Sequence, residues 1–334
     1  MTTNTILKWI QWLLAAVLIL IIPMVFLLRS VGGRPINPAP SEPVAPSDAL
    51  QPIEDVAVPQ APPIPTIDPV RGRVTLLVMG LDRRQGESIL TRTDTMLLLS
   101  IDSRTDSAAM ISIPRDLLVD IAGYRPHRIN AAFLLGAQEG GEARGAELAM
   151  QTVETNLGVQ VDHYVLLDFD TVQTLIDSVG GVDVVVPKTI NDPTYPDGNY
   201  GFDPLYIEAG NHLFDGEVAL KYMRSRHGNS DFDRAARQQQ VALAYRERLA
   251  SQGVGEVLTS LPTLIDEVYG GFYTDLTVDE LVSLAQAATE VTSYKITMEV
   301  LDYDYVESRA SEGNGSVLVL RQNALSQLHQ KLFQ

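Results

Sequence analysis

Cysteine is absent from this 334-residue chain, so disulfide bonds, thiolate metal sites and cysteine nucleophiles are excluded. Basic residues are also scarce: 25 Lys and Arg stand against 42 Asp and Glu, which gives a formal net charge of −17. Because a phosphate backbone requires a basic surface, this charge argues against general nucleic-acid binding. The five histidines show no metal-ligand spacing, and the sequence contains neither a G-x-S-x-G elbow nor a P-loop. Several common classes of enzyme are thereby excluded.

One apolar run, from Ile6 to Leu28, is long enough to span a bilayer. Trp9 and Trp12 suit the membrane interface, and no clear small-residue cleavage site follows the run. We therefore expect a short tail over residues 1–5 followed by an uncleaved transmembrane anchor over residues 6–28. A cleaved export signal is the alternative.

Proline marks the next segment, residues 29–70, which holds eleven of the nineteen prolines in the chain. Such a composition cannot build a helix or a strand ladder and favours extended polyproline II. We expect a stiff spacer there, followed by one globular domain over residues 71–334 that is long enough to bury a sizeable core.

The globular region mixes short apolar segments with helical patterns. This mixture predicts an α/β fold, specifically an α-β-α sandwich with a central mixed, largely antiparallel sheet. The C-terminal portion is expected to complete the sheet and its cover. Expected strands cover residues 74–80, 94–102, 107–114, 163–169, 182–187 and 295–303. Expected helices cover residues 141–158, 170–181, 241–253, 277–290 and 323–333.

The first three expected strands allow a geometric deduction. In an antiparallel meander, the end of the first strand, the start of the second and the end of the third share one sheet edge. Asp82, Asp94 and the pair Arg115–Asp116 occupy these positions. Two convergent carboxylates could hold a hard cation such as Mg²⁺, and the arginine fork matches phosphate oxygens. The alternative is that the two aspartates cap turns and pair with Arg84 and Arg92 in the intervening loop.

A basic cluster stands out in this acidic chain, in the stretch RSRHGNSDFDRAARQQQ (224–240). Ser230 with an acid three residues later predicts a helix start, after which Asp231, Arg234 and Gln238 share one helix face. An arginine row near a helix N-terminus is typical of an anion site. The alternative is a solvated face with local ion pairs, although each such pair contributes only about 0–1 kcal/mol. The arginines of this cluster are Arg224, Arg226, Arg234 and Arg237.

These motifs resemble those of the LytR-CpsA-Psr family of cell-envelope glycopolymer phosphotransferases. The resemblance rests on motifs that occur in the family's order between residues 74 and 250, and it covers the spacer and residues 255–334 with less force. The motifs are LLVMGLDRR (76–84), TRTDTMLLLSID (91–102), SIPRD (112–116), HRIN (127–130), VDHYVLLDFD (161–170), GGVDVVVP (180–187) and ALKYMRSRHGNSDFDRAARQQQ (219–240).

The resemblance implies an extracytoplasmic catalytic domain on a single plasma-membrane helix, with the tail in the cytoplasm. It implies transfer of a glycan phosphate from a polyprenyl-pyrophosphate carrier to a peptidoglycan hydroxyl, with Mg²⁺, or Mn²⁺ in its place. Asp82 and Asp94 would be metal ligands and, with Arg115 and Asp231, the catalytic residues. Asp231 would either orient Arg234 or accept the acceptor's proton. The pyrophosphate would be held by Arg84, Arg92, Arg115, Arg128, Arg224, Arg226, Arg234, Arg237 and Gln238.

The sequence departs from the family pattern at three places. Arg128 stands where many relatives carry lysine, Ala131 stands where relatives often carry histidine, and the loop between Arg226 and Asp231 is shorter than in many relatives. Two other functions stay open at this point. One is polyprenyl-pyrophosphate hydrolysis at the same site, and the other is a non-catalytic regulator that binds the lipid-linked glycan.

Overall fold

The computed structural model describes residues 72–83, 87–196, 201–225, 230–251, 270–277, 280, 284, 291, 293–311 and 314–333. The expected tail, anchor and spacer (1–5, 6–28 and 29–70), together with Arg84 and Arg226, lie outside the described residues. Within the described part of the chain, no helix combines the length and apolar character needed to cross a bilayer.

A six-stranded sheet forms the centre of the molecule, with strand order β11-β6-β1-β2-β3-β12. The pairs β1–β2, β2–β3 and β6–β11 are antiparallel, whereas β1–β6 and β3–β12 are parallel. The expectation of a mixed, largely antiparallel sheet is therefore confirmed. The strands are β1 (Arg73–Leu81), β2 (Thr93–Asp102), β3 (Ser107–Ser112), β6 (His163–Leu167), β11 (Phe272–Thr274) and β12 (Ile296–Val300).

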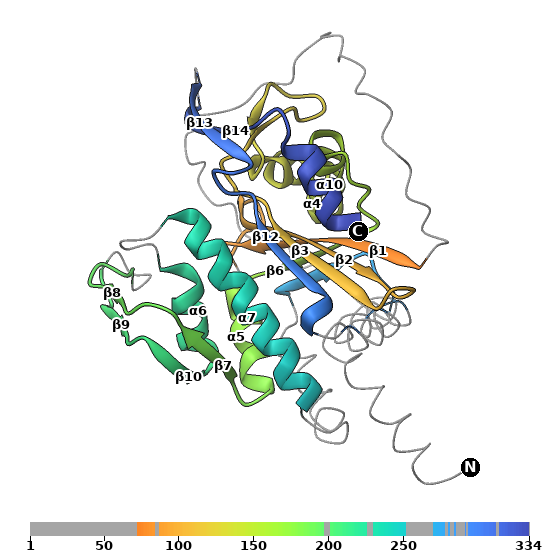
Figure 1. Ribbon diagram of the computed structural model, residues 1–334. Helices are drawn as coiled ribbons and strands as arrows, with labels where there is room; N and C mark the ends of the chain where they lie inside the picture. The colour runs from red at the N-terminus through yellow and green to blue at the C-terminus, as the bar shows by residue number, and fades with distance from the viewer. Residues whose placement is uncertain are drawn as a thin grey trace, which may run out of the picture.

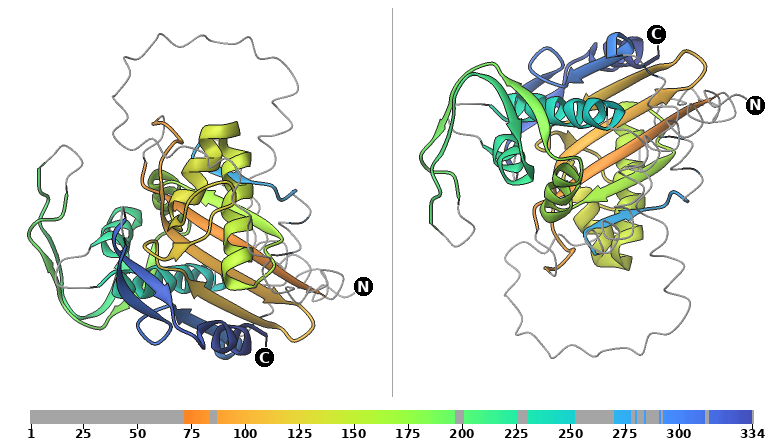
Figure 2. Two further views of the ribbon diagram at one scale, coloured as in Figure 1. Left: turned by 90° about the horizontal axis from the view of Figure 1, so that it is seen from above. Right: turned by 90° about the horizontal axis from the view of Figure 1, so that it is seen from below.

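Helices cover both faces of this sheet, as an α-β-α sandwich requires (Figures 1 and 2). On one face lie α4 (Ala131–Leu157) and α10 (Ala324–Phe333), which share a hydrophobic core with β1 and β2. On the other face lie α5 (Phe169–Ser178), α6 (Gly216–Arg224) and α7 (Asp231–Ser251).

Four two-stranded ribbons and one 3₁₀ helix complete the described fold. The β7–β10 ribbon packs beside α7, and the β13–β14 hairpin lies next to β4. The ribbons are β4 (Leu118–Val119) with β5 (His127–Arg128), β7 (Val182–Val186) with β10 (Gly210–Phe214), β8 (Ile190–Asp192) with β9 (Leu205–Ile207), and β13 (Val306–Ser311) with β14 (Gly315–Leu320); the 3₁₀ helix is η2 (Ser293–Lys295).

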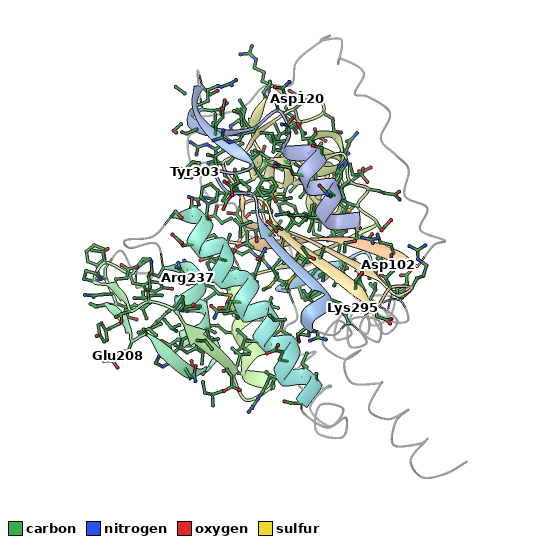
Figure 3. All side chains as sticks on the ribbon, viewed as in Figure 1. Asp102, Asp120, Glu208, Arg237, Lys295 and Tyr303 are labelled. Carbon is green, nitrogen blue, oxygen red and sulfur yellow. The ribbon has the colours of Figure 1, made fainter. Side chains whose placement is uncertain are left out.

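Alternation along the strands divides the apolar side chains between the two faces. On β1, Leu77, Met79 and Leu81 are fully buried against α4 and the elements around it. Val78 and Gly80 alternate with these residues along β1 and therefore lie on the face covered by α5, α6 and α7, where they line a groove. Side chains otherwise fill the layers on both sides of the sheet (Figure 3).

Two helices differ from the sequence expectation: α6 was not expected, and α4 begins earlier than expected. The helix expected over 141–158 begins ten residues earlier, at Ala131, because the chain continues as a helix across a kink at Gly140 and Gly141, where Gly141 has φ +77°. The expectation that the C-terminal portion completes the sheet and its cover is confirmed. Strand β12 extends the central sheet beside β3, and α10 packs on the same face of the sheet as α4. Most of the expected helix over 277–290 lies outside the described residues.

Candidate active site

The meander brings the predicted acidic and basic residues to one edge of the sheet. Leu81 pairs with Thr93, so Asp82, directly after β1, and Asp94, the second residue of β2, lie at the same edge. Arg115 comes three residues after β3, and its Nη1 donates to Asp94 Oδ2 at 2.8 Å. The geometric deduction from the strand pattern is therefore confirmed for these three residues.

Helices α6 and α7 bring two arginines from the basic cluster to the same edge. Arg224 ends α6; its Nη2 lies 3.6 Å from Asp82 Oδ1, and its guanidinium carbon lies 4.0 Å from the centre of the Phe169 ring. Arg234, one turn into α7, donates to the backbone oxygen of Asp94 at 3.3 Å. These contacts join the sheet edge to both helices.

The start of α7 is fixed as the sequence predicts. The Asp233 carboxylate accepts from the Ser230 backbone N–H at 2.8 Å, and Ser230 Oγ accepts from the Asp233 N–H at 3.1 Å. This is a capping box, which satisfies N–H groups that the first helical turn would otherwise leave unpaired. Hydrogen bonds donated to the Asp233 carboxyl by the Ser230 N–H and by Ser230 Oγ lower its pKa. The cap fixes where α7 begins, and from the first turn of this helix Arg234 reaches the backbone oxygen of Asp94.

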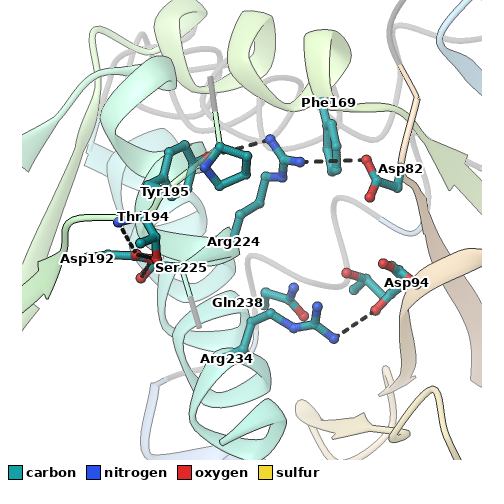
Figure 4. Close-up of a pocket in the computed structure, with 12 residues that line it drawn as sticks. Asp82, Asp94, Phe169, Asp192, Thr194, Tyr195, Arg224, Ser225, Arg234 and Gln238 are labelled. Carbon is teal, nitrogen blue, oxygen red and sulfur yellow. Dashed lines mark hydrogen bonds and ion pairs between the residues drawn. The ribbon is translucent and has the colours of Figure 1, made fainter. Parts of the chain in front are cut away.

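A polar cavity of about 490 Å³ opens between these elements, and we call it the phosphate cavity (Figure 4). In the close-up, Arg224 and Arg234 point toward Asp82 and Asp94 respectively. The cavity is lined by Asp82, Asp94, Thr95, Phe169, Asp192, Thr194, Tyr195, Pro196, Arg224, Ser225, Arg234 and Gln238.

Asp231 lies between two arginines beside this cavity. Its Oδ2 is 3.5 Å from Arg115 Nε and its Oδ1 is 3.5 Å from Arg234 Nη2. Burial alone would lower the pKa of Arg115, but the carboxylates of Asp94 and Asp231 outweigh it, so the pKa is raised. Arg115 therefore stays charged at any working pH, as an anion-binding group must.

Other predicted residues lie away from the cavity lining. Arg92 is exposed, and Arg128 contacts Asp116 at 3.1 Å and two carbonyl oxygens near the β13–β14 hairpin. Arg237 is 7% exposed and donates from Nε to the Tyr222 carbonyl oxygen at 2.9 Å, and it also donates to the Ser225 carbonyl. Arg237 was expected to hold the pyrophosphate. In the structure its guanidinium instead binds carbonyl oxygens at the C-terminal end of α6. Burial lowers the pKa of this guanidinium.

Sequence reasoning missed several residues of the site. Asp192 is buried and accepts from Ser225 Oγ at 2.8 Å, and Tyr195 Oη lies 3.5 Å from Arg224 Nη1. Both come from the β8–β9 region, where no periodic pattern indicates which side chains turn inward. Phe169 lay within a recognised motif, at the end of the strand expected over residues 163–169, and this was the available signal.

Arg83 is the most informative of the missed residues. It is 5% exposed, its Nη2 lies 3.2 Å from Asp168 Oδ2, and its Nη1 donates to the Glu87 carbonyl oxygen at 2.9 Å. Asp168 in turn caps α5 by accepting from the Thr171 N–H at 3.0 Å. Because Arg83 follows Asp82 and Asp168 precedes Phe169, this buried pair fixes the two positions that contact Arg224.

An apolar groove of about 300 Å³ runs from the phosphate cavity beneath α5, α6 and α7. Its floor is the sheet, with Val78, Leu97 and Leu99 facing the helices. Thr95, Phe169, Arg224 and Gln238 line both the groove and the phosphate cavity, so the two spaces are continuous.

The arrangement suits an amphipathic anion chemically. Guanidinium groups bind phosphate oxygens, the two aspartates at the strand ends offer hard oxygen ligands, and the adjoining groove accepts hydrocarbon. No group of three metal-ligating His, Asp or Glu side chains occurs among the residues that the structure describes.

Comparison with known proteins identifies the family. The protein-family model described as the LytR_cpsA_psr family matches residues 51–334. The polyisoprenyl-teichoic acid–peptidoglycan teichoic acid transferase TagU of Oceanobacillus iheyensis is 34% identical over 229 residues, which are 68% of this chain and 66% of that protein. Regulatory protein MsrR of Staphylococcus aureus is 33% identical over 183 residues, which are 54% of this chain and 50% of that protein.

A solved structure shares the fold. The crystal structure of Bacillus subtilis TagV is 26% identical with a TM-score of 0.61, and the match covers 78% of this chain and 96% of that chain. TagV is also named a polyisoprenyl-teichoic acid–peptidoglycan teichoic acid transferase. The matches span about half to two thirds of the length of the curated relatives. The family match over most of the chain and the shared fold lead to one conclusion: this chain belongs to the LytR_cpsA_psr family.

Proposed function

We propose that this protein transfers a glycan phosphate from a polyprenyl-pyrophosphate carrier to a hydroxyl of peptidoglycan, and so attaches a glycopolymer to the cell wall. The observation that carries the proposal is the continuity of the phosphate cavity with the apolar groove. A polyprenyl-pyrophosphate glycan has the same two parts, a pyrophosphate head and a hydrocarbon tail. The names of TagU and TagV agree with this reading.

The arginines would supply the main catalytic effect. Phosphoryl transfer depends mostly on positioning the groups and on neutralising charge at the phosphorus and the leaving group. Arg115, Arg224 and Arg234 are each already oriented by a carboxylate, so little reorganisation is needed when the anion binds. Gln238 lines both spaces and would contact the substrate where head and tail meet.

Asp82 and Asp94 fit a magnesium site. Magnesium is usually held by one or two protein carboxylates, with water and substrate phosphates as the remaining ligands. The two aspartates are hard oxygen donors at adjacent strand ends, and both remain partly exposed toward the cavity. Bound Mg²⁺, or Mn²⁺, would neutralise charge on the pyrophosphate.

Asp231 would act as an orienting residue. Its two carboxylate oxygens lie 3.5 Å from Arg115 and Arg234 respectively, so it sets the distance between two of the anion-binding groups. The anchor over residues 6–28 would hold this domain at the outer face of the plasma membrane, where the polyprenyl carrier and peptidoglycan meet.

The test is a transfer assay with the full-length chain in detergent. A labelled polyprenyl-pyrophosphate oligosaccharide, Mg²⁺ and peptidoglycan fragments are incubated with the wild type and with the Arg115→Ala and Asp94→Ala variants. We expect label on peptidoglycan, reduced about 10²–10³-fold in both variants. Arg115→Ala removes a preorganised cation at the phosphorus, and Asp94→Ala removes both a metal ligand and the carboxylate that orients Arg115. Arg309→Ala, at an exposed arginine paired with Glu307, is the matched control and should retain full activity.

Chelation and product analysis separate the other functions. Removing divalent cations with EDTA should abolish transfer, and adding Mg²⁺ should restore it. Label released only as soluble sugar phosphate would identify a hydrolase instead. Lipid binding without turnover, even with Mg²⁺ and acceptor present, would support a regulator, the role that the name of MsrR states for that protein.

A further inference from the structure

A second polar cavity, of about 520 Å³, lies beside the phosphate cavity between α5 and α6. We call it the α5–α6 cavity. Tyr195 and Arg224 line both cavities, so the second one begins at the side chains that would hold the pyrophosphate. The transfer reaction needs a second substrate, the acceptor hydroxyl, next to the phosphorus. Apart from the residues shared with the phosphate cavity, no residue that lines the α5–α6 cavity has yet been given a role in this reaction.

The lining of the α5–α6 cavity follows one face of each helix. Asp170, Gln173 and Asp177 are spaced three and then four apart on α5, so their side chains share a face. Glu217 and Lys221 are four apart on α6, and Arg224 follows three residues later. The eight residues from Asp170 to Asp177 are separated by seven helical rises, about 10 Å of helix, which is long enough for two linked sugar rings.

The charge of this cavity is opposite to that of the arginine cluster. Lys221 Nζ lies 2.6 Å from Asp203 Oδ2 and 2.7 Å from Glu217 Oε1, so two carboxylates already compensate its charge. Hydrogen bonds to Asp203 and then to Glu217 raise the pKa of this amine. With Asp170 and Asp177, four carboxylates line this cavity against two cations, Lys221 and Arg224. The excess of negative charge disfavours a phosphate-bearing glycan here.

The same side chains suit an uncharged sugar. Carboxylates accept hydrogen bonds from hydroxyl and N–H groups, and the Gln173 amide both donates and accepts. Resting on the transferase function proposed above, we propose that the α5–α6 cavity binds an uncharged sugar of the peptidoglycan acceptor and directs its hydroxyl to the phosphate cavity.

The step served by this binding is a simple displacement. The acceptor oxygen forms a bond to the glycan-bearing phosphorus, and the bond from that phosphorus to the bridging oxygen breaks. Polyprenyl phosphate leaves with the bridging oxygen, and the hydroxyl proton is released to water. The cavity supplies the position of the acceptor oxygen, and no oxidant or further reactant is needed.

Binding of an uncharged probe tests the assignment without turnover. Chitotetraose, a neutral tetramer of N-acetylglucosamine, is titrated by calorimetry into the full-length wild type and the double variant Gln173→Ala/Glu217→Gln. We expect affinity to fall about 4–100-fold, since each of the two lost hydrogen bonds weakens binding about 2–10-fold. Glu307→Gln, another exposed carboxylate in an ion pair, is the matched control and should bind normally. A glycerol-phosphate oligomer that binds more tightly than chitotetraose and loses affinity in the double variant would overturn the assignment.

Kinetics distinguish the acceptor from the donor as the occupant. In the double variant the KM for acceptor should rise by the same factor, with kcat and the KM for donor unchanged. Gln173→Trp, which fills the cavity, should have the same effect. A rise in the KM for donor instead would overturn the proposal.

The two proposals can fail separately. Saccharide binding that depends on Gln173 and Glu217 in a protein without transfer activity would support the sugar site and contradict the transferase function. Transfer with unchanged acceptor KM and unchanged saccharide affinity in both variants would overturn the sugar site and leave the transferase function standing.

Discussion

The two faces of the central sheet are built from the same strands, yet one is closed and the other is hollow. Toward α4 and α10, Leu77, Met79 and Leu98 are fully buried in one continuous core. Toward α5, α6 and α7, Val78 and Leu99 line a groove of about 300 Å³. A closed interior normally packs as densely as an organic crystal, so leaving this space open forgoes stabilising contacts. One face therefore supplies stability, whereas the other gives up packing contacts and keeps a groove open.

Truncating neighbouring leucines should give the largest difference between the faces. Leu98→Ala should lower the free energy of unfolding by about 2–5 kcal/mol, because it opens a cavity in a packed core. Leu99→Ala should cost less than half as much, because its side chain already borders open space. Urea unfolding of both variants measures the difference, and equal losses would contradict the contrast between the faces.

Filling the groove should separate stability from substrate binding. Val78→Phe should leave the free energy of unfolding within about 1 kcal/mol of the wild type, because the groove has room for the ring. The KM for the polyprenyl donor should rise about 10-fold or more, since each CH₂ group excluded from the groove forfeits about 0.8 kcal/mol. The same exchange at Val185, which is 60% exposed on β7, is the control and should leave the KM unchanged.

The smallest effect is expected at the end of the sheet remote from the site, where Figure 3 labels Asp102. Asp102 is buried and is held by Arg104 and Arg73, and hydrogen bonds from Arg104 lower its pKa from 3.8 to about 2. A lowered pKa stabilises the fold above pH 4, and this stabilisation is lost as the pH falls from about 4 to 2. The contribution amounts to at most about 2 kcal/mol.

Acid unfolding of Asp102→Asn measures this contribution. The variant should lack the part of the pH dependence between about pH 4 and 2, while its transfer activity at neutral pH should match that of the wild type. An unchanged slope in that pH range would show that another carboxyl is responsible.

Periodicity and strand pairing were enough to predict the sheet edge. A meander has one arrangement of strand ends, so Asp82, Asp94 and Arg115 had to converge. The capping pattern at Ser230 likewise predicted the start of α7, because it depends only on local hydrogen bonds. Features that depend on adjacent residues or on a single strand register are accessible from sequence.

Features that depend on packing between distant segments were not accessible. Arg237 is three residues from Arg234, and helical spacing alone cannot tell that its guanidinium turns inward to the α6 carbonyls. Arg83 and Arg84 are equivalent in the sequence, and only the position of Asp168 in the folded chain distinguishes Arg83. The groove could not be located either, since the same apolar pattern along β1 and β2 describes a filled face and a hollow one.

The buried pair of Arg83 and Asp168 has an evolutionary consequence. Replacing either residue alone leaves an unpaired charge in the interior, at a cost of about 3–5 kcal/mol, whereas replacing both with apolar residues of similar volume is tolerated far better. Single-step mutation at either position therefore passes through a poorly folded intermediate. In descendants of this chain, positions 83 and 168 should change together or not at all. The adjacent residues Asp82 and Phe169 are restricted in the same way, because the buried pair fixes their positions.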